Sequence, residues 1–179
     1  MIYAIASLFD IKTDDRTREL WDWIQCVCSL DGISISPIPH FSWFVGESLL
    51  SGEVEQALIA AAKNYPPFEV NVVDIGIFTG DHPIVYLGLQ KDKTLVRLHQ
   101  TMRQAISQKT NGTSLFYEPD QWIPHITLAY HEHDVERLAC TVRQLVFRFR
   151  PMKLSVKEIG LIYQNLDQYG VAMKYAFTG

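Results

Sequence analysis

Two short segments of the sequence each place a hydroxyl residue two positions after a histidine. The first reads PHFS and contains His40 and Ser42, and the second reads PHIT and contains His125 and Thr127. Both lie in apolar runs that predict β-strands. Because successive side chains of a strand point to opposite faces, each histidine should share a face with its hydroxyl residue. Each strand therefore offers an imidazole and a hydroxyl together.

Two such strands facing each other suit proton transfer at both ends of one displacement reaction. An imidazole has an ordinary pKa of about 6.5, so one neutral ring can accept a proton from an attacking water or hydroxyl while the other, protonated, donates one to the leaving oxygen. In-line attack at phosphorus puts these oxygens on opposite sides, and the two hydroxyls can donate hydrogen bonds to the non-bridging phosphate oxygens. This chemistry requires no metal ion or other cofactor. A lone strand histidine is more often structural, but the repeated pair favours an active site.

The two motifs and the segments around them resemble a known family. The chain is similar to the two-histidine (2H) phosphoesterase superfamily, which includes the bacterial 2'-5' RNA ligase-like and cyclic phosphodiesterase enzymes and is defined by two His-x-Thr/Ser motifs in two pseudosymmetric lobes. The resemblance covers almost the whole chain. It extends to the segments FEVNVVDIGIFTGDHPIVYLGLQKDKTLVRLHQTM, FYEPDQWIPHITLAY and EIGLIYQNLDQYGVAMKYAF.

This resemblance implies both a fold and a function. The fold is a bilobal, pseudo-twofold α+β domain over residues 1–179, with two antiparallel sheets facing a central cleft and helices outside. The implied activity is metal-independent hydrolysis of a 2',3'-cyclic nucleotide or of an RNA 2',3'-cyclic phosphate end, with 2'-5' ligation as its reverse. His40 and His125 take the catalytic places, and Ser42 and Thr127 take the phosphate-binding places. The first motif departs from the family in having Ser42 where threonine is commoner and aromatic neighbours where smaller aliphatic residues are usual.

The hydrophobic pattern predicts much the same order of elements in each half of the chain. Strands are expected at Ile2–Phe9, in IPHFSWF, at Phe68–Phe78 and Ile84–Leu89, in WIPHITLAY, and at Met152–Tyr163 and Val171–Phe177; helices are expected from Thr13 to Leu30, from Ser51 to Ala62, over Thr94–Gln108 and from His133 to Phe147. Such a pattern fits two lobes packed as one body.

Composition limits the class of protein and of partner. The chain has 179 residues, of which 47% are hydrophobic, and its 20 acidic and 16 basic residues give a net charge of -4. It should fold around a proper core, and its surface lacks the broad positive field of a protein that grips long nucleic acid. No apolar run approaches the roughly 20 residues of a membrane span. We expect a cytoplasmic monomer whose partner is a small cyclic nucleotide or an RNA 3' end, with Cys26, Cys28 and Cys140 as buried, reduced thiols.

Several other residues have both a functional and a structural interpretation. Tyr130 follows the second motif and could contact a ligand, and strand alternation puts Phe44 on the histidine's side as a wall for the substrate. The remaining residues are expected to be structural: Lys12, Arg16 and Arg18 on a solvated helix face, His131 and His133 at an exposed helix start capped by Asp134 rather than on a metal, and His99 on the helix surface.

Two further functional hypotheses stay open at this stage. The fold could serve as a nucleotide- or RNA-end-binding module without turnover, or the repeated motif could reflect duplicated strand packing alone. The packing hypothesis gives no reason for both hydroxyls to recur on the histidine's face. A binding module would be expected to lose one histidine first.

Overall fold

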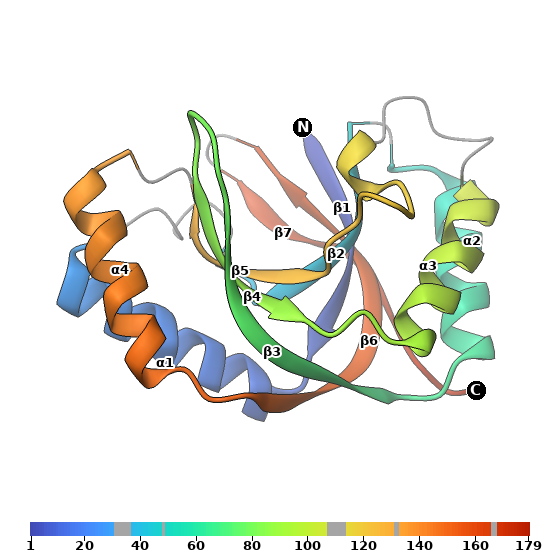
Figure 1. The fold of residues 1–179 in the computed structure, drawn as a ribbon. Helices are drawn as coiled ribbons and strands as arrows, with labels where there is room; N and C mark the ends of the chain where they lie inside the picture. The colour runs from blue at the N-terminus through green and yellow to red at the C-terminus, as the bar shows by residue number, and fades with distance from the viewer. Residues whose placement is uncertain (31–36, 48, 107–113, 131–132, 166–167) are drawn as a thin grey trace.

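The computed structural model describes residues 1–30, 37–47, 49–106, 114–130, 133–165 and 168–179. It is a mixed α+β structure, as the sequence predicts (Figure 1). Its elements are β1 (Ile2–Phe9), α1 (Ile11–Cys28), β2 (His40–Gly46), α2 (Gly52–Asn64), β3 (Phe68–Phe78), β4 (Ile84–Leu89), α3 (Lys93–Ile106), the short 3₁₀ helix η2 (Leu115–Tyr117), β5 (His125–Tyr130), α4 (Val135–Arg148), β6 (Met152–Gln164) and β7 (Tyr169–Ala176).

The seven strands form one antiparallel sheet in the order β2-β1-β6-β3-β4-β5, with β7 also paired to β6. The long strand β6 connects the two halves of this sheet, because its first half pairs with β3 and its second half pairs with both β1 and β7. The two predicted sheets are therefore the two halves of one continuous sheet. The motif strands β2 and β5 stand at its opposite ends, yet they contact each other. Figure 1 shows a strongly curved sheet, and this curvature brings its two ends together.

The helices pack in pairs that mix the two halves of the sequence. Helices α1 and α4 contact each other on one flank, and α2 and α3 contact each other on the other (Figure 1). Each flank thus carries one helix from the first half of the chain and one from the second. No helix within the described ranges is both long enough and apolar enough to cross a membrane.

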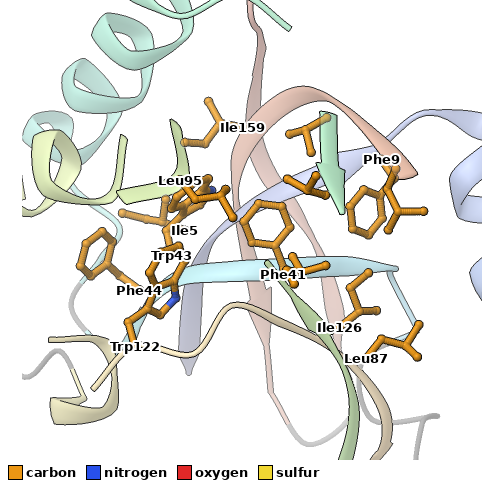
Figure 2. Close-up of a cluster of buried hydrophobic side chains, with 14 of the residues drawn as sticks. Ile5, Phe9, Phe41, Trp43, Phe44, Leu87, Leu95, Trp122, Ile126 and Ile159 are labelled. Carbon is orange, nitrogen blue, oxygen red and sulfur yellow. The ribbon is translucent and has the colours of Figure 1, made fainter. Parts of the chain in front are cut away.

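The main hydrophobic core fills the helix-covered side of the sheet and is rich in aromatic rings. Figure 2 shows Phe41, Trp43 and Phe44 of β2 packed there with Trp122. Burial of such rings contributes about 25 cal/mol per Å² of apolar surface removed from water. A smaller cluster on the other side contains Ala4, Ala6, Leu8 and Ile162. The short side chain of Ala4 lines a cleft on this side of the sheet.

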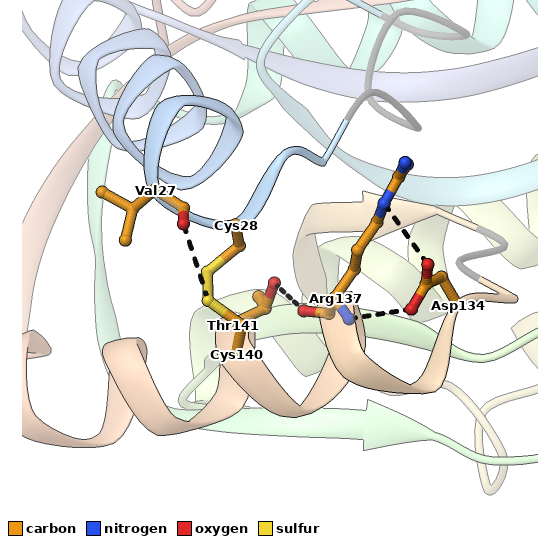
Figure 3. The surroundings of a disulfide bond; sticks show 6 residues. All are labelled: Val27, Cys28, Asp134, Arg137, Cys140 and Thr141. Atoms are coloured by element: carbon orange, nitrogen blue, oxygen red, sulfur yellow. Dashed lines mark hydrogen bonds and ion pairs between the residues drawn. A yellow bond between two sulfur atoms is a disulfide. The ribbon is translucent and has the colours of Figure 1, made fainter.

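A disulfide connects the two helices of one flank. Cys28 in α1 and Cys140 in α4 are bonded, with their Cα atoms 5.7 Å apart (Figure 3). The prediction of three buried, reduced thiols was therefore wrong for this pair, and Cys26 is free but exposed. The packing of α1 on α4 brings together two cysteines that are 112 positions apart. No sequence spacing reveals such a contact.

Candidate active site

A β-bulge follows the hydroxyl residue of the first motif. In the pairing of β1 with β2, Ala6 is opposite Ser42 and Ile5 is opposite Phe44, so Trp43 is an extra residue on β2. A bulge of this kind reverses the inside–outside alternation of the residues beyond it.

The second motif has the same irregularity at the same place. Tyr86 of β4 is opposite Thr127, whereas Val85 is opposite Ala129, so Leu128 is the extra residue on β5. The two motifs therefore share a backbone feature as well as a sequence pattern. The sequence pattern alone does not predict the bulge.

The bulges decide which aromatic and aliphatic residues reach the cleft. Trp43 and Phe44 are both buried in the core, and Val45 lines the cleft. The prediction that Phe44 faces the substrate was wrong, because it assumed unbroken alternation; its side chain is only 1% exposed. On β5 the same shift puts Tyr130 on the cleft, where a ligand contact was predicted.

A cleft of about 230 Å³ lies on the side of the sheet away from the main core. It is lined by the imidazoles and hydroxyls of both motifs: His40, Ser42, His125 and Thr127. The tertiary structure therefore brings together the four residues that the sequence singled out, although 85 positions separate the motifs.

Both histidines are oriented in the same way by their own chain. The Nδ1 atom of His40 lies 2.6 Å from the carbonyl oxygen of Ile38, and Nδ1 of His125 lies 2.7 Å from that of Ile123. A carbonyl can only accept, so Nδ1 carries the proton and donates it. In each motif, the proline between the two residues favours the extended backbone before it. Neutral His40 and His125 therefore keep the unprotonated Nε2 for a reacting group.

The environment lowers the pKa of both histidines. Burial is the largest cause at His40; the Ile38 carbonyl opposes it, and the positive charge of His125 lowers the pKa further. Burial likewise lowers the pKa of His125, against the opposing effect of the Ile123 carbonyl. Because a charge on one ring disfavours a charge on the other, the state with one neutral and one protonated histidine is favoured over a doubly charged pair. This is the state that paired acid and base catalysis requires.

Two tryptophans bind the backbone at the bulges. The indole Nε1 of Trp122, just before β5, donates to the carbonyl oxygen of Ser42 at 3.0 Å. The indole Nε1 of Trp21, in α1, donates to the carbonyl oxygen of Thr127, also at 3.0 Å. A bulge disrupts the strand ladder locally, so these donors satisfy carbonyl groups beside the disruption. The backbone carbonyl of each hydroxyl residue is thus bound by an indole from another part of the chain.

Tyr117 is a cleft residue that the sequence reasoning missed. It ends η2 and lines the cleft, and its hydroxyl is hydrogen-bonded to the Ser42 side chain. Burial is the main cause that raises its pKa to about 12, so the phenol stays neutral. Its segment, FYEPDQWIPHITLAY, belongs to the family resemblance, but no spacing within it pointed to this tyrosine.

His99 of α3 lies behind the first motif rather than on the surface. Its ring is 1% exposed and stacks between Phe44 and Trp122, with centroid distances of 4.8 and 4.2 Å. Burial, against the effect of a bond to the backbone carbonyl of Tyr117, lowers its pKa to about 4. The prediction of a surface histidine was wrong because this face of α3 packs against aromatic rings from β2 and from the segment before β5. Its Nε2 has no hydrogen-bond partner.

The described basic and metal-binding candidates are not among the residues that line the cleft. Arg18 binds Asp14 at 2.5 Å and the carbonyl oxygen of Pro37 at 2.8 Å, and Lys12 and Arg16 are not among the residues that line the cleft. Asp134 caps α4, as predicted, by accepting from two backbone N–H groups. His131 falls outside the described residues. Within those residues, no three histidine, cysteine, aspartate or glutamate side chains form a metal-binding group.

Comparison with known proteins agrees with this geometry. The sequence profile of the 2'-5' RNA ligase superfamily matches residues 37–168, a segment that contains both motifs. The chain belongs to the 2'-5' RNA ligase superfamily. This confirms the predicted resemblance to the 2H phosphoesterases. No curated protein matches the chain by sequence.

Solved structures of this superfamily's fold cover nearly the whole chain. TT0787 of Thermus thermophilus superposes with a TM-score of 0.68 at 16% sequence identity, over 99% of this chain and 98% of its own. A structure titled phosphoesterase gives 0.67 at 18% identity, with the same coverage. LigT of E. coli, complexed with 3'-AMP, gives 0.62 at 16% identity and again covers 99% and 98%. These likenesses confirm the predicted α+β architecture of the superfamily.

Proposed function

We propose that the chain hydrolyses a cyclic phosphoester without a metal ion, either a 2',3'-cyclic nucleotide or the 2',3'-cyclic phosphate at an RNA 3' end. The observation that carries this proposal is the single cleft that holds His40, His125 and both hydroxyl residues. Membership of the superfamily supports a phosphoesterase or ligase activity. LigT has been crystallised with 3'-AMP, a nucleoside 3'-phosphate, which is the chemical class of one product of such a hydrolysis.

The proposed reaction is an in-line displacement at phosphorus. The neutral imidazole accepts a proton from water at Nε2 as the water oxygen bonds to phosphorus. The bond from phosphorus to one ribose oxygen breaks, and the protonated imidazole donates its Nε2 proton to that oxygen. The hydroxyls of Ser42 and Thr127 donate to the non-bridging oxygens, where negative charge is concentrated in the transition state. The product is a 2'- or 3'-phosphate monoester.

The same groups can run 2'-5' ligation. If a ribose 5'-hydroxyl takes the place of water, attack on the cyclic phosphate forms a new phosphodiester, with the same two proton transfers. The orientation of the cyclic ester in the cleft sets which ribose oxygen leaves and which histidine acts as the base.

Turnover of adenosine 2',3'-cyclic phosphate in the presence of EDTA tests the proposal. We expect the rate to be unaffected by the chelator and to fall about 10²- to 10⁴-fold in His40→Ala and, separately, in His125→Ala. His133→Ala is the matched control, because this histidine is exposed and outside the cleft. Loss of activity in only one of the two motif variants would refute the paired roles. Binding of the cyclic nucleotide without any turnover would instead identify a binding module.

The pH dependence provides a second test. The rate should fall at low pH, where the base becomes protonated, and at high pH, where the acid loses its proton, which gives a bell-shaped profile. Because burial lowers the pKa of both histidines, the centre of the bell should lie on the acid side of about 6.5. A rate that rises steadily through neutral pH contradicts the mechanism.

A further inference from the structure

We propose that the cleft selects a cyclic phosphodiester with a single negative charge, a nucleoside 2',3'-cyclic monophosphate, over the same ester carrying additional phosphate groups. This inference rests on the proposed function and narrows its substrate class. It follows from the few ionisable side chains among the described residues that line the cleft.

The cleft offers few charges to a ligand. Among the described residues that line it, none is a lysine, arginine, aspartate or glutamate. Among these described lining residues, the groups that ionise closest to neutral pH are the imidazoles of His40 and His125. Because a charge on one ring disfavours a charge on the other, the pair holds at most one positive charge. One imidazolium balances one negative charge. A cyclic phosphodiester carries one such charge, so the ligand and the cleft are neutral together.

The remaining lining is uncharged and largely aromatic. Tyr3, Tyr117, Tyr130 and Tyr163 line the cleft together with Trp21. Such rings provide flat apolar faces for a nucleobase and hydroxyl or indole groups for neutral hydrogen bonds. They offer nothing to offset a second phosphate, whose removal from water without a counter-charge is strongly unfavourable. The net charge of -4 adds a general repulsion.

Two cations near the site are engaged elsewhere. Arg18, beside the segment that leads to the first motif, is held by Asp14 and by the Pro37 carbonyl. Lys91 donates to the carbonyl oxygens of Pro119 and Trp122. Neither lines the cleft.

The size of the cleft and the charge of the product agree with this selection. Its volume of about 230 Å³ is below the usual 300–1,000 Å³ of small-molecule pockets, which suits one nucleotide better than an oligonucleotide.

The product of the reaction carries more charge than the substrate. A phosphate monoester has a charge of about -1.5 to -2 at pH 7, so one imidazolium does not neutralise it. The cleft should therefore release its product readily.

The test compares three substrates of equal chemistry and increasing charge: adenosine 2',3'-cyclic phosphate, the same compound with a 5'-phosphate, and a trinucleotide ending in a 2',3'-cyclic phosphate. We expect kcat/KM for the first to exceed the others by at least about tenfold at low salt, with a smaller difference at high salt. Equal or faster turnover of the more highly charged substrates would overturn the inference and leave the proposed function intact. If none is turned over, the proposed function fails instead. Binding of the three compounds to His40→Ala then tests the charge preference. Tighter binding of the more highly charged compounds would overturn the inference.

Adding a cation to the cleft gives a second test. Tyr130→Arg should tighten inhibition of adenosine 2',3'-cyclic phosphate turnover by inorganic phosphate at least about tenfold, because a hydrogen-bonded charge pair replaces a neutral contact. Tyr130→Phe is the matched control and should leave the inhibition constant within about twofold. Similar inhibition constants in the two variants would show that the missing cation does not limit anion binding, which overturns the inference.

Discussion

Removing the indole N–H of Trp122 should lower the rate of the reaction more than it affects substrate binding. Trp122→Phe keeps an aromatic ring in the stack with His99 but removes the donor to the Ser42 carbonyl. Ser42 is 9% exposed and Trp122 is 2% exposed, so water cannot readily replace the lost donor. Leaving a buried acceptor without a partner costs about 1–3 kcal/mol.

The expected fall in kcat follows from the position of the Ser42 carbonyl. It belongs to Ser42, which lines the cleft and directly precedes the bulge. A displacement of a positioned group by about 1 Å can cost about 10²-fold in rate. We therefore expect kcat on adenosine 2',3'-cyclic phosphate to fall about 10- to 100-fold, with KM changed by less than about threefold. Trp21→Phe should likewise lower kcat through the Thr127 carbonyl, and because Trp21 also lines the cleft, this variant should change KM as well.

The control for this prediction is a hydrogen bond of similar burial away from the cleft. Ser7→Ala removes the acceptor of the Trp43 indole, a buried bond of 2.9 Å on the core side of the sheet. It should cost comparable stability, measured by urea unfolding, with little change in kcat. If Ser7→Ala lowers kcat as much as the two tryptophan variants do, or if those variants change only KM, the indoles do not position the hydroxyl residues.

Two further predictions concern stability. The pKa of His99 is about 4 in the folded protein and about 6.5 when unfolded, so between these values the unfolded chain binds more protons. The free energy of unfolding should therefore fall as the pH drops from about 6.5 to 4, and His99 should contribute about 3 kcal/mol to this fall. His99→Phe should make the fall smaller. An unchanged slope of unfolding free energy against pH in that variant would contradict this origin. The Cys28–Cys140 disulfide closes a loop over a separation of 112 residues, so replacing both cysteines by serine should cost about 2–5 kcal/mol. Cys26→Ser is the control, since that thiol is free and exposed, and equal denaturant midpoints for the double variant and the control would count against a stabilising bond.

The sequence by itself determined most of the elements and predicted the chemistry that we propose. The spacing of apolar residues predicted β3 and β4 with their observed ends, and the residue types at helix starts predicted Ser51 and Asp134 as caps. The repeated histidine-hydroxyl motif predicted that His40 and His125 belong to one site. These features depend on residues that are close together in the sequence, so the sequence alone can predict them.

The tertiary structure decided which side chains surround that chemistry. The bulges after Ser42 and Thr127 arise from pairing with β1 and β4, and they moved Phe44 into the core and Tyr130 to the cleft. Packing between helices from different halves of the chain buried His99 and joined Cys28 to Cys140. Contacts of this kind depend on how distant segments fold together in space, so no period or spacing in the sequence specifies them.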